Sequence, residues 1–297
     1  MSRIIRGVSK NARFFLVDTT DIVQEALNIH KCSPTAIDAF GRLLTAGVIM
    51  GSTLKGKDVL TLRTDTDGLL NNMVVTATAD GGVKGYLSNP SADVPLRDDG
   101  KSNVGALVGR GTMKIIKDMG LKEPYVGIST VDTGEIAQDL AYYFYNSEQT
   151  PTVIALGVKL KDTNTVACAG GYMLQLLPDA EDEFITALEN KIQAIRPMTE
   201  LMMGGMDLER ILKLLYEDMN SEDNEKLVES YEILEEKEVS YKCDCNKDKF
   251  YKGLITLGKE ELNKIFAEEE KIEAECHFCG KRYEFKKEDF KDILEVK

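Results

Sequence analysis

Four cysteines near the end of the chain have the spacing that a metal site requires. One residue separates Cys243 from Cys245, two separate Cys276 from Cys279, and thirty lie between the pairs. Each pair can lie on one tight turn, and Zn²⁺ takes four such sulfur ligands in a tetrahedron. The C-x-x-C pair is ordinary for zinc, whereas the C-x-C pair is shorter than most. The spacing therefore predicts one zinc ion bound by four thiolates.

This cysteine cluster has more than one interpretation. Inert buried thiols are disfavoured because Lys, Asp and Glu surround the cysteines. A purely structural zinc site stays open. A redox site is the sharper hypothesis, because zinc holds its ligands as thiolates, the form that attacks oxidants. Each pair is also close enough in sequence to form a disulfide once the metal leaves, and a C-x-C disulfide closes a small ring, which indicates a labile bond.

The other two cysteines and the two histidines are not needed for the predicted zinc site. Cys32 and Cys168 are isolated, and we interpret both as small, buried or half-buried side chains. His277 lies inside the second cysteine turn and is an alternative zinc ligand, although four cysteines already fill a tetrahedral site. His30 is expected at the surface, at the end of a helix.

Charge and motifs exclude several function classes. The net charge of the chain is −13. A net −7 of this falls in residues 221–297, around the cysteines, which argues against a nucleic-acid-binding zinc ribbon. The chain has no phosphate-binding loop, dinucleotide fingerprint or nucleophile elbow. We therefore expect a protein that is not an enzyme and does not bind nucleic acid.

The expected location is the cytoplasm. The first residues lack the pattern of a secretory signal peptide, and the longest apolar run, around Leu43 to Leu54, is too short to span a membrane. In a reducing compartment a cysteine cluster indicates metal or redox chemistry more than structural disulfides.

Length and patterning predict an α+β protein of more than one domain. The 297 residues exceed the usual size of one domain. In residues 1–178, strands and helices mix without a regular βαβ repeat, which predicts a mixed sheet domain packed with helices. Ser33 and Pro34 predict the start of a buried helix that runs to about Thr53. The expected strands cover residues 13–19, 57–64, 72–78, 83–87, 107–117, 125–131, 153–160 and 165–177.

The pattern changes after Pro178. Residues 179–236 contain amphipathic stretches and a methionine-rich segment, Met198 to Met206, and we predict a helical, metastable linker. Residues 237–297 form the predicted zinc-binding α+β domain. This domain is too small for a sizeable core, so we expect bound metal to contribute much of its folding free energy.

Several stretches resemble one known family over essentially the whole chain. They are the two cysteine pairs at about the family's separation, TGEIAQDLAYYF (Thr133 to Phe144), SEQTP (Ser147 to Pro151), ALGV (Ala155 to Val158) and GGYMLQLLP (Gly170 to Pro178). On these residues the chain resembles the 33-kilodalton heat-shock proteins, which are redox-regulated holdase chaperones.

The resemblance implies a mechanism. The reduced protein would bind one Zn²⁺ per chain through Cys243, Cys245, Cys276 and Cys279 and be inactive. Oxidation would form disulfides Cys276–Cys279 and then Cys243–Cys245, release zinc, unfold the C-terminal domain and free the linker. The exposed apolar surface would bind unfolding clients without ATP, and the oxidised form would be a homodimer. The alternatives are a zinc-ribbon interaction or nucleic-acid module without redox switching, and an enzyme in the first domain with structural zinc.

Overall fold

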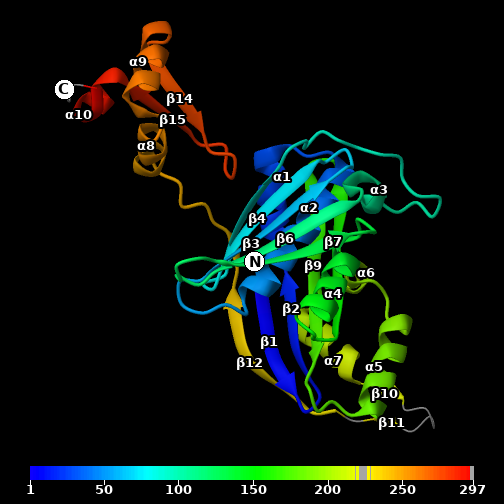
Figure 1. The fold of residues 1–297 in the computed structure, drawn as a ribbon. Helices are drawn as coiled ribbons and strands as arrows, with labels where there is room; N and C mark the ends of the chain where they lie inside the picture. Colours follow the sequence, from blue (N-terminus) through cyan, green and yellow to red (C-terminus); the bar gives the residue numbers. More distant parts are fainter. Residues whose placement is uncertain (218, 221–225, 228, 295–297) are drawn as a thin grey trace. The chain divides into compact units, whose positions relative to one another are not determined.

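The structure is a computed structural model that describes residues 1–217, 219–220, 226–227 and 229–294 (Figure 1). The chain divides into two compact units, Met1–Tyr241 and Lys242–Lys297. Helices and strands are combined in both units, which confirms the predicted α+β class. Within the part of the chain that is described, no helix combines the length and the apolar character needed to cross a bilayer.

Two sheets form the frame of the first unit. One has five antiparallel strands in the spatial order β12 (Tyr231–Glu238), β1 (Arg3–Ser9), β2 (Ala12–Asp18), β9 (Thr165–Leu176) and β8 (Thr152–Asp162). The other has the order β13 (Ser240–Tyr241), β5 (Gly82–Leu87), β4 (Asn72–Thr78), β3 (Val59–Thr66), β6 (Gly111–Asp118) and β7 (Tyr125–Val131). This second sheet is antiparallel except that β13 runs parallel to β5.

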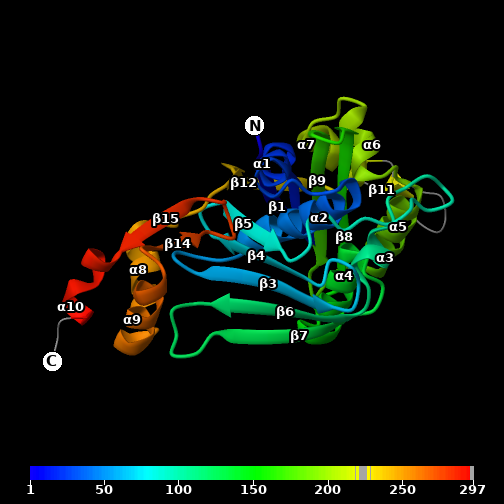
Figure 2. The same cartoon turned by 90° about the horizontal axis from the view of Figure 1, so that it is seen from above.

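A buried helix joins the two sheets of this unit. Helix α2 (Pro34–Gly51) packs against strands of both sheets, as Figure 2 shows from above, and sixteen of its residues are buried. The predicted cap is confirmed: the Ser33 side chain accepts a hydrogen bond from the Ala36 amide at 3.2 Å, with proline at the first helical position. The other helices of this region are α1 (Thr20–His30), α3 (Val104–Val108) and α4 (Ile136–Ser147).

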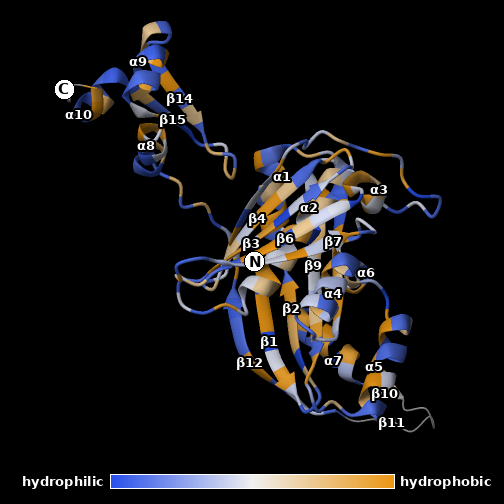
Figure 3. Ribbon diagram, viewed as in Figure 1, coloured by the Kyte–Doolittle hydropathy of each residue, from blue (hydrophilic) through white to orange (hydrophobic). Residues whose placement is uncertain are grey.

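The opposite face of the five-stranded sheet is covered by three helices from the predicted linker. They are α5 (Asp182–Ala194), α6 (Met198–Met203) and α7 (Leu208–Tyr216). Their buried side chains form one cluster with apolar residues of the sheet, many of which appear as the orange positions of β1, β2 and α7 in Figure 3. The sheet contributes Ile5, Ala12, Phe14, Leu16, Tyr172 and Leu174 to this cluster. These helices therefore hide an apolar sheet surface from water.

In the first unit, the structure differs from the predicted strands and linker at three places. Residues 231–236 were expected in the helical linker, and this is wrong, because they belong to β12, whose antiparallel ladder with β1 outweighs a weak helical pattern. The β1 strand itself was not predicted. The strand expected from Leu107 is also wrong at its start, because Asn103 caps the short helix α3 and β6 begins only at Gly111. Residues 221–225 and 228 of the predicted linker lie outside the described residues.

The second unit has little core. It contains α8 (Lys247–Ile255), α9 (Gly258–Glu268), the hairpin of β14 (Lys271–Glu275) and β15 (Arg282–Lys286), a 3₁₀ turn (Lys287–Phe290) and α10 (Lys291–Leu294). The strands of the hairpin pair from Lys271 opposite Lys286 to Glu275 opposite Arg282. Among the described residues, the buried apolar side chains that cluster here are Leu262, Phe285 and Phe290.

Candidate metal centre

Two short turns position the four cysteines. Cys276 and Cys279 lie in the turn that joins β14 to β15, where the amides of Cys279 and Gly280 donate to the Cys276 carbonyl at 3.2 and 2.8 Å. Gly280 adopts a φ of 68°, a backbone conformation that favours glycine and reverses the chain after the second cysteine. Cys243 and Cys245 come directly before α8. Asn246 caps the start of that helix, and its side chain accepts a hydrogen bond from the Lys249 amide at 2.9 Å.

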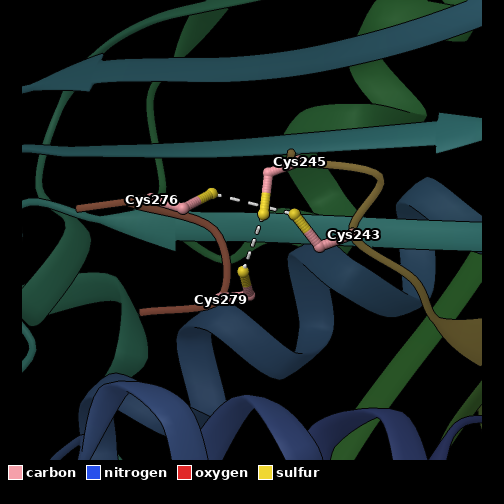
Figure 4. Close-up of side chains that lie close together, drawn as sticks. All are labelled: Cys243, Cys245, Cys276 and Cys279. Atoms are coloured by element: carbon pink, nitrogen blue, oxygen red, sulfur yellow. Dashed lines mark hydrogen bonds between the residues drawn. The ribbon is translucent and has the colours of Figure 1, made fainter. Parts of the chain in front are cut away.

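The structure brings all four sulfur atoms together, as Figure 4 shows. They lie within 4.8 Å of one another, and all four cysteines are free thiols. The two short Sγ–Sγ distances join different turns, 3.7 Å from Cys243 to Cys276 and 3.3 Å from Cys245 to Cys279. Zinc bonds of 2.3 Å in a tetrahedron place sulfur atoms about 3.8 Å apart. The residues present therefore fit a four-thiolate zinc ion with only small movements.

The local environment separates the pKa values of these thiols. Burial raises the pKa of Cys243, and burial with hydrogen bonds from the other cysteines raises the pKa of Cys279 to about 12. At Cys245 burial acts in the same direction, but hydrogen bonds from Tyr283 and the other cysteines outweigh it and lower the pKa to about 7. Cys245 is therefore the thiol of this group for which the protein alone favours the thiolate.

Tyr283 is a site residue that the sequence reasoning missed. Its hydroxyl oxygen lies 3.1 Å from Cys245 Sγ, within reach to donate a hydrogen bond to the sulfur. The Tyr283 ring packs on Phe250 of α8 with ring centroids 4.9 Å apart. The only signal in the sequence is an aromatic residue four positions after Cys279 on a strand, and that position does not indicate which cysteine it contacts.

The other candidate residues do not belong to the group of converging ligand atoms found among the described residues. His277 is exposed, and its ring nitrogens are not among the ligand atoms that converge. Cys32 and Cys168 are buried, as interpreted from the sequence, and burial raises their pKa values to about 12 and about 11. The expectation that His30 is a surface residue is wrong. Its ring is half-buried, with Nε2 3.1 Å from the Gly85 carbonyl oxygen and 3.3 Å from the Tyr241 hydroxyl.

Comparisons with known proteins agree over the whole chain. The family model described as Hsp33 protein matches residues 2–286. The "33 kDa chaperonin" of Clostridium botulinum (strain Loch Maree) is 39% identical over 99% of this chain and 97% of its own length. The protein of the same name from Clostridium perfringens (strain SM101) is 41% identical over 99% and 92%.

A solved structure is similar as well. The crystal structure of the 33 kDa chaperonin (heat shock protein 33 homolog) of Thermotoga maritima matches with a TM-score of 0.87 and 31% identity. The match covers 99% of this chain and 98% of that one. Both the model match and the identities extend across the two units, cysteine turns included. The chain therefore belongs to the Hsp33 protein family.

Proposed function

We propose that this protein is an ATP-independent chaperone of the cytoplasm that oxidation activates. The observation that carries the proposal is the convergence of four thiols from two turns in a unit whose fully buried core is small. Relatives named 33 kDa chaperonin support the chaperone role. In this proposal the zinc-loaded, reduced protein is inactive, and the oxidised protein binds unfolding clients.

The proposed metal centre is one Zn²⁺ per chain, bound by Cys243, Cys245, Cys276 and Cys279. The distances between the sulfurs and the all-thiol donor set support it. When bound, the ion supplies positive charge that keeps the four sulfurs deprotonated at neutral pH. That charge would oppose the burial that raises the pKa values of Cys243 and Cys279.

In the proposed switch, the reduced state connects the two cysteine turns to each other, whereas the oxidised state has one disulfide within each turn. A thiolate attacks peroxide, which breaks the O–O bond, forms a sulfenic acid and releases hydroxide. The second thiol of the pair then attacks that sulfur, which forms the S–S bond and releases the hydroxyl group as water. Each pair of thiols therefore gives two electrons to one peroxide, and the two thiol protons leave with its two oxygen atoms as two water molecules. Disulfides Cys243–Cys245 and Cys276–Cys279 each lie within one turn, whereas the short contacts in the structure cross between turns. Oxidation therefore removes the connection that holds the two turns together.

Loss of that connection would unfold the second unit and loosen the linker. We propose domains of 1–178 for the chaperone core, 179–236 for the linker and 237–297 for the redox switch. In the described part of the second unit, the fully buried apolar cluster consists of three side chains, which is a small core for so many residues, so the metal contributes much of its stability. Release of α5, α6 and α7 would expose the apolar sheet face that they cover. We propose that this apolar surface binds unfolding client proteins and that the oxidised protein is a homodimer.

The decisive experiment compares two redox states of one preparation. Zinc content, free thiols and suppression of the aggregation of a thermally unfolding client are measured before and after peroxide treatment. We expect one zinc and, counted after denaturation, six reduced cysteines per chain before treatment, with the loss of zinc and of four reduced cysteines accompanying the gain of activity. Equal activity in both states would contradict the proposal, as would a thiol-protected protein that contains no zinc.

A further inference from the structure

Strand β12, at one edge of the five-stranded sheet, is held to its neighbour β1 mainly by main-chain hydrogen bonds. β12 pairs with β1 from Arg3 opposite Glu238 to Ser9 opposite Tyr231, with a register shift between Arg6 and Gly7. Five of the eight β12 side chains are exposed. The most exposed apolar one is Leu234, at 62%, which the shift leaves without a partner in the register. Recognition of β12 by β1 therefore depends little on its side chains.

The side-chain contacts of β12 are few and lie mostly at the surface. Arg3 and Arg6 of β1 form ion pairs with Glu236 and Glu235 at 2.6 and 2.5 Å. Ion pairs this exposed contribute about 0–1 kcal/mol each. Tyr231 makes the main apolar contacts: its ring packs edge-on against Phe14, with centroids 5.9 Å apart, and against Tyr216 of α7, with centroids 5.1 Å apart. Lys237 donates a hydrogen bond to the Ala79 carbonyl. A different extended segment with few matching side chains could therefore replace β12.

β12 is also the strand of this sheet that lies nearest in sequence to the cysteines. Only residues 239–242 separate its end from Cys243. Those residues are anchored within the first unit, where the Val239 amide donates to the Ser2 carbonyl at 3.1 Å and the Tyr241 hydroxyl donates to the Gly85 carbonyl at 2.8 Å. Unfolding that begins at the first cysteine turn and proceeds towards the N-terminus would break the hydrogen bonds of Tyr241 and Val239 first and the pairing of β12 next.

The edge that β12 leaves is suited to an extended chain. β1 stays paired with β2 along its other side, so it keeps the shape of a strand. Its unpaired amides and carbonyls form a template for strand addition, as in β-augmentation. Gly7 permits a close approach, because a Cβ there would lie 2.0 Å from the Glu232 carbonyl oxygen of β12. The adjoining sheet face carries Ile5 and Phe14, which can contact alternate apolar side chains of the incoming segment.

We propose that the edge of β1 binds the main chain of an extended segment of an unfolding protein in the place of β12. This inference rests on the proposed function, because β12 must leave when the protein is activated. Main-chain pairing is common to all polypeptides, so it suits a surface that must accept many sequences. β12 then acts as an internal competitor that blocks the edge in the reduced protein.

The test uses the full-length, peroxide-treated protein and two synthetic peptides. The first has the sequence of β12, residues 231–238, with blocked ends. The matched control has the same side chains and charge but is N-methylated at alternate amides, which removes the donors needed for strand pairing. Hydrogen exchange of the segment 3–9 and capture of a thermally unfolding client are measured with each peptide.

We expect oxidation to speed exchange in residues 3–9, and client or the β12 peptide to slow it again. The β12 peptide in excess should reduce client capture several-fold, and the N-methylated peptide should leave capture unchanged. Equal effects of the two peptides, no effect of either, or no faster exchange on oxidation would overturn the proposal. Protection of β1 that depends on protein concentration without client would also overturn it, since a second copy would then fill the edge. In each of these cases continued client protection by the oxidised protein would leave the proposed function standing.

Discussion

A single hydroxyl group next to the cysteines is expected to set part of their metal affinity. Tyr283 lies within hydrogen-bond distance of Cys245 Sγ, 3.1 Å away. Outer-shell donors of this kind orient metal ligands, and their loss commonly costs about 10–100-fold in metal affinity. We expect Tyr283→Phe to weaken zinc binding about tenfold and to speed zinc release by peroxide, since the Cys245 thiolate loses a donor that withdraws its charge. Competition with a chromophoric chelator measures the affinity.

Tyr251 of the same unit provides the matched control. Its ring stacks on Phe290 with centroids 5.2 Å apart, so Tyr251→Phe also removes one hydroxyl and keeps an aromatic contact. This variant should keep the zinc affinity of the unchanged protein. A similar loss of affinity in both variants would show that general destabilisation of the unit, and not the bond to Cys245, is responsible.

Replacement of one proposed ligand should have a larger effect. Cys276 is buried and its sulfur lies 3.7 Å from that of Cys243. A serine hydroxyl is a poor zinc ligand at neutral pH, so Cys276→Ser should lower zinc affinity and leave residues 242–294 open to proteolysis even in the reduced protein. Cys168→Ser, which changes a buried cysteine outside the cluster, should keep full zinc content. Unchanged zinc content and protease resistance in Cys276→Ser would refute the assignment.

At the scale of helices and strands, local signals predicted the structure and long-range pairing escaped prediction. The Ser33 cap and the following proline gave the start of α2 because both act within one turn. The cysteine spacing indicated two turns for the same reason. In contrast, β12 carries adjacent Ile233 and Leu234 and many glutamates, so its apolar residues follow neither the helical period of 3.6 residues nor the strand period of two. Its conformation depends on pairing with β1, more than two hundred residues away. Tyr283 likewise meets Cys245 only through the fold of the hairpin.

One arginine joins two elements of the proposed linker to the sheet. Arg3 of β1 donates to both carboxylate oxygens of Glu209 in α7, at 2.5 and 2.6 Å, and to Glu236 in β12. Both carboxylates are partly exposed, so we expect Arg3→Ala to weaken the docking of α7 and β12 by only about 1 kcal/mol. Faster hydrogen exchange in residues 208–216 would report this change. Arg63→Ala, which removes an exposed pair with Asp65 in the other sheet, should leave that exchange unchanged.

The same contact predicts a dependence on pH. The hydrogen bond from Arg3 lowers the pKa of Glu209 below its ordinary value of 4.5. A carboxylate whose pKa is depressed in the folded state adds stability above its unfolded-state pKa and loses it as the pH falls through the folded-state value. Exchange in residues 208–216 should therefore accelerate as the pH drops below 4.5, after correction for the intrinsic exchange rate. Arg3→Ala should remove this part of the pH dependence, and an identical profile in both proteins would contradict it.

For the whole molecule, the two units differ in what keeps them folded. The first has two extensive buried clusters around its sheets, whereas the described part of the second buries three apolar side chains together. Apolar burial is the main favourable term in folding, so the sheets of residues 1–178 should stay folded without metal and the second unit should not. A chelator added under reducing conditions should therefore raise hydrogen exchange throughout residues 242–294 towards the rates of an unfolded chain. Slow exchange in α2 should persist.

Adding zinc back distinguishes unfolding of the second unit by metal removal from unfolding by oxidation. Chelation leaves the four thiols intact, so added zinc should restore protection in residues 242–294, whereas after peroxide zinc alone should fail until a reductant opens the disulfides. This difference follows because the sulfurs are ligands only as thiolates. A second unit that keeps slow exchange without zinc would show that its helices and hairpin are sufficient for folding. Zinc would then contribute little to the stability of the second unit, and oxidation of its ligands would not unfold that unit.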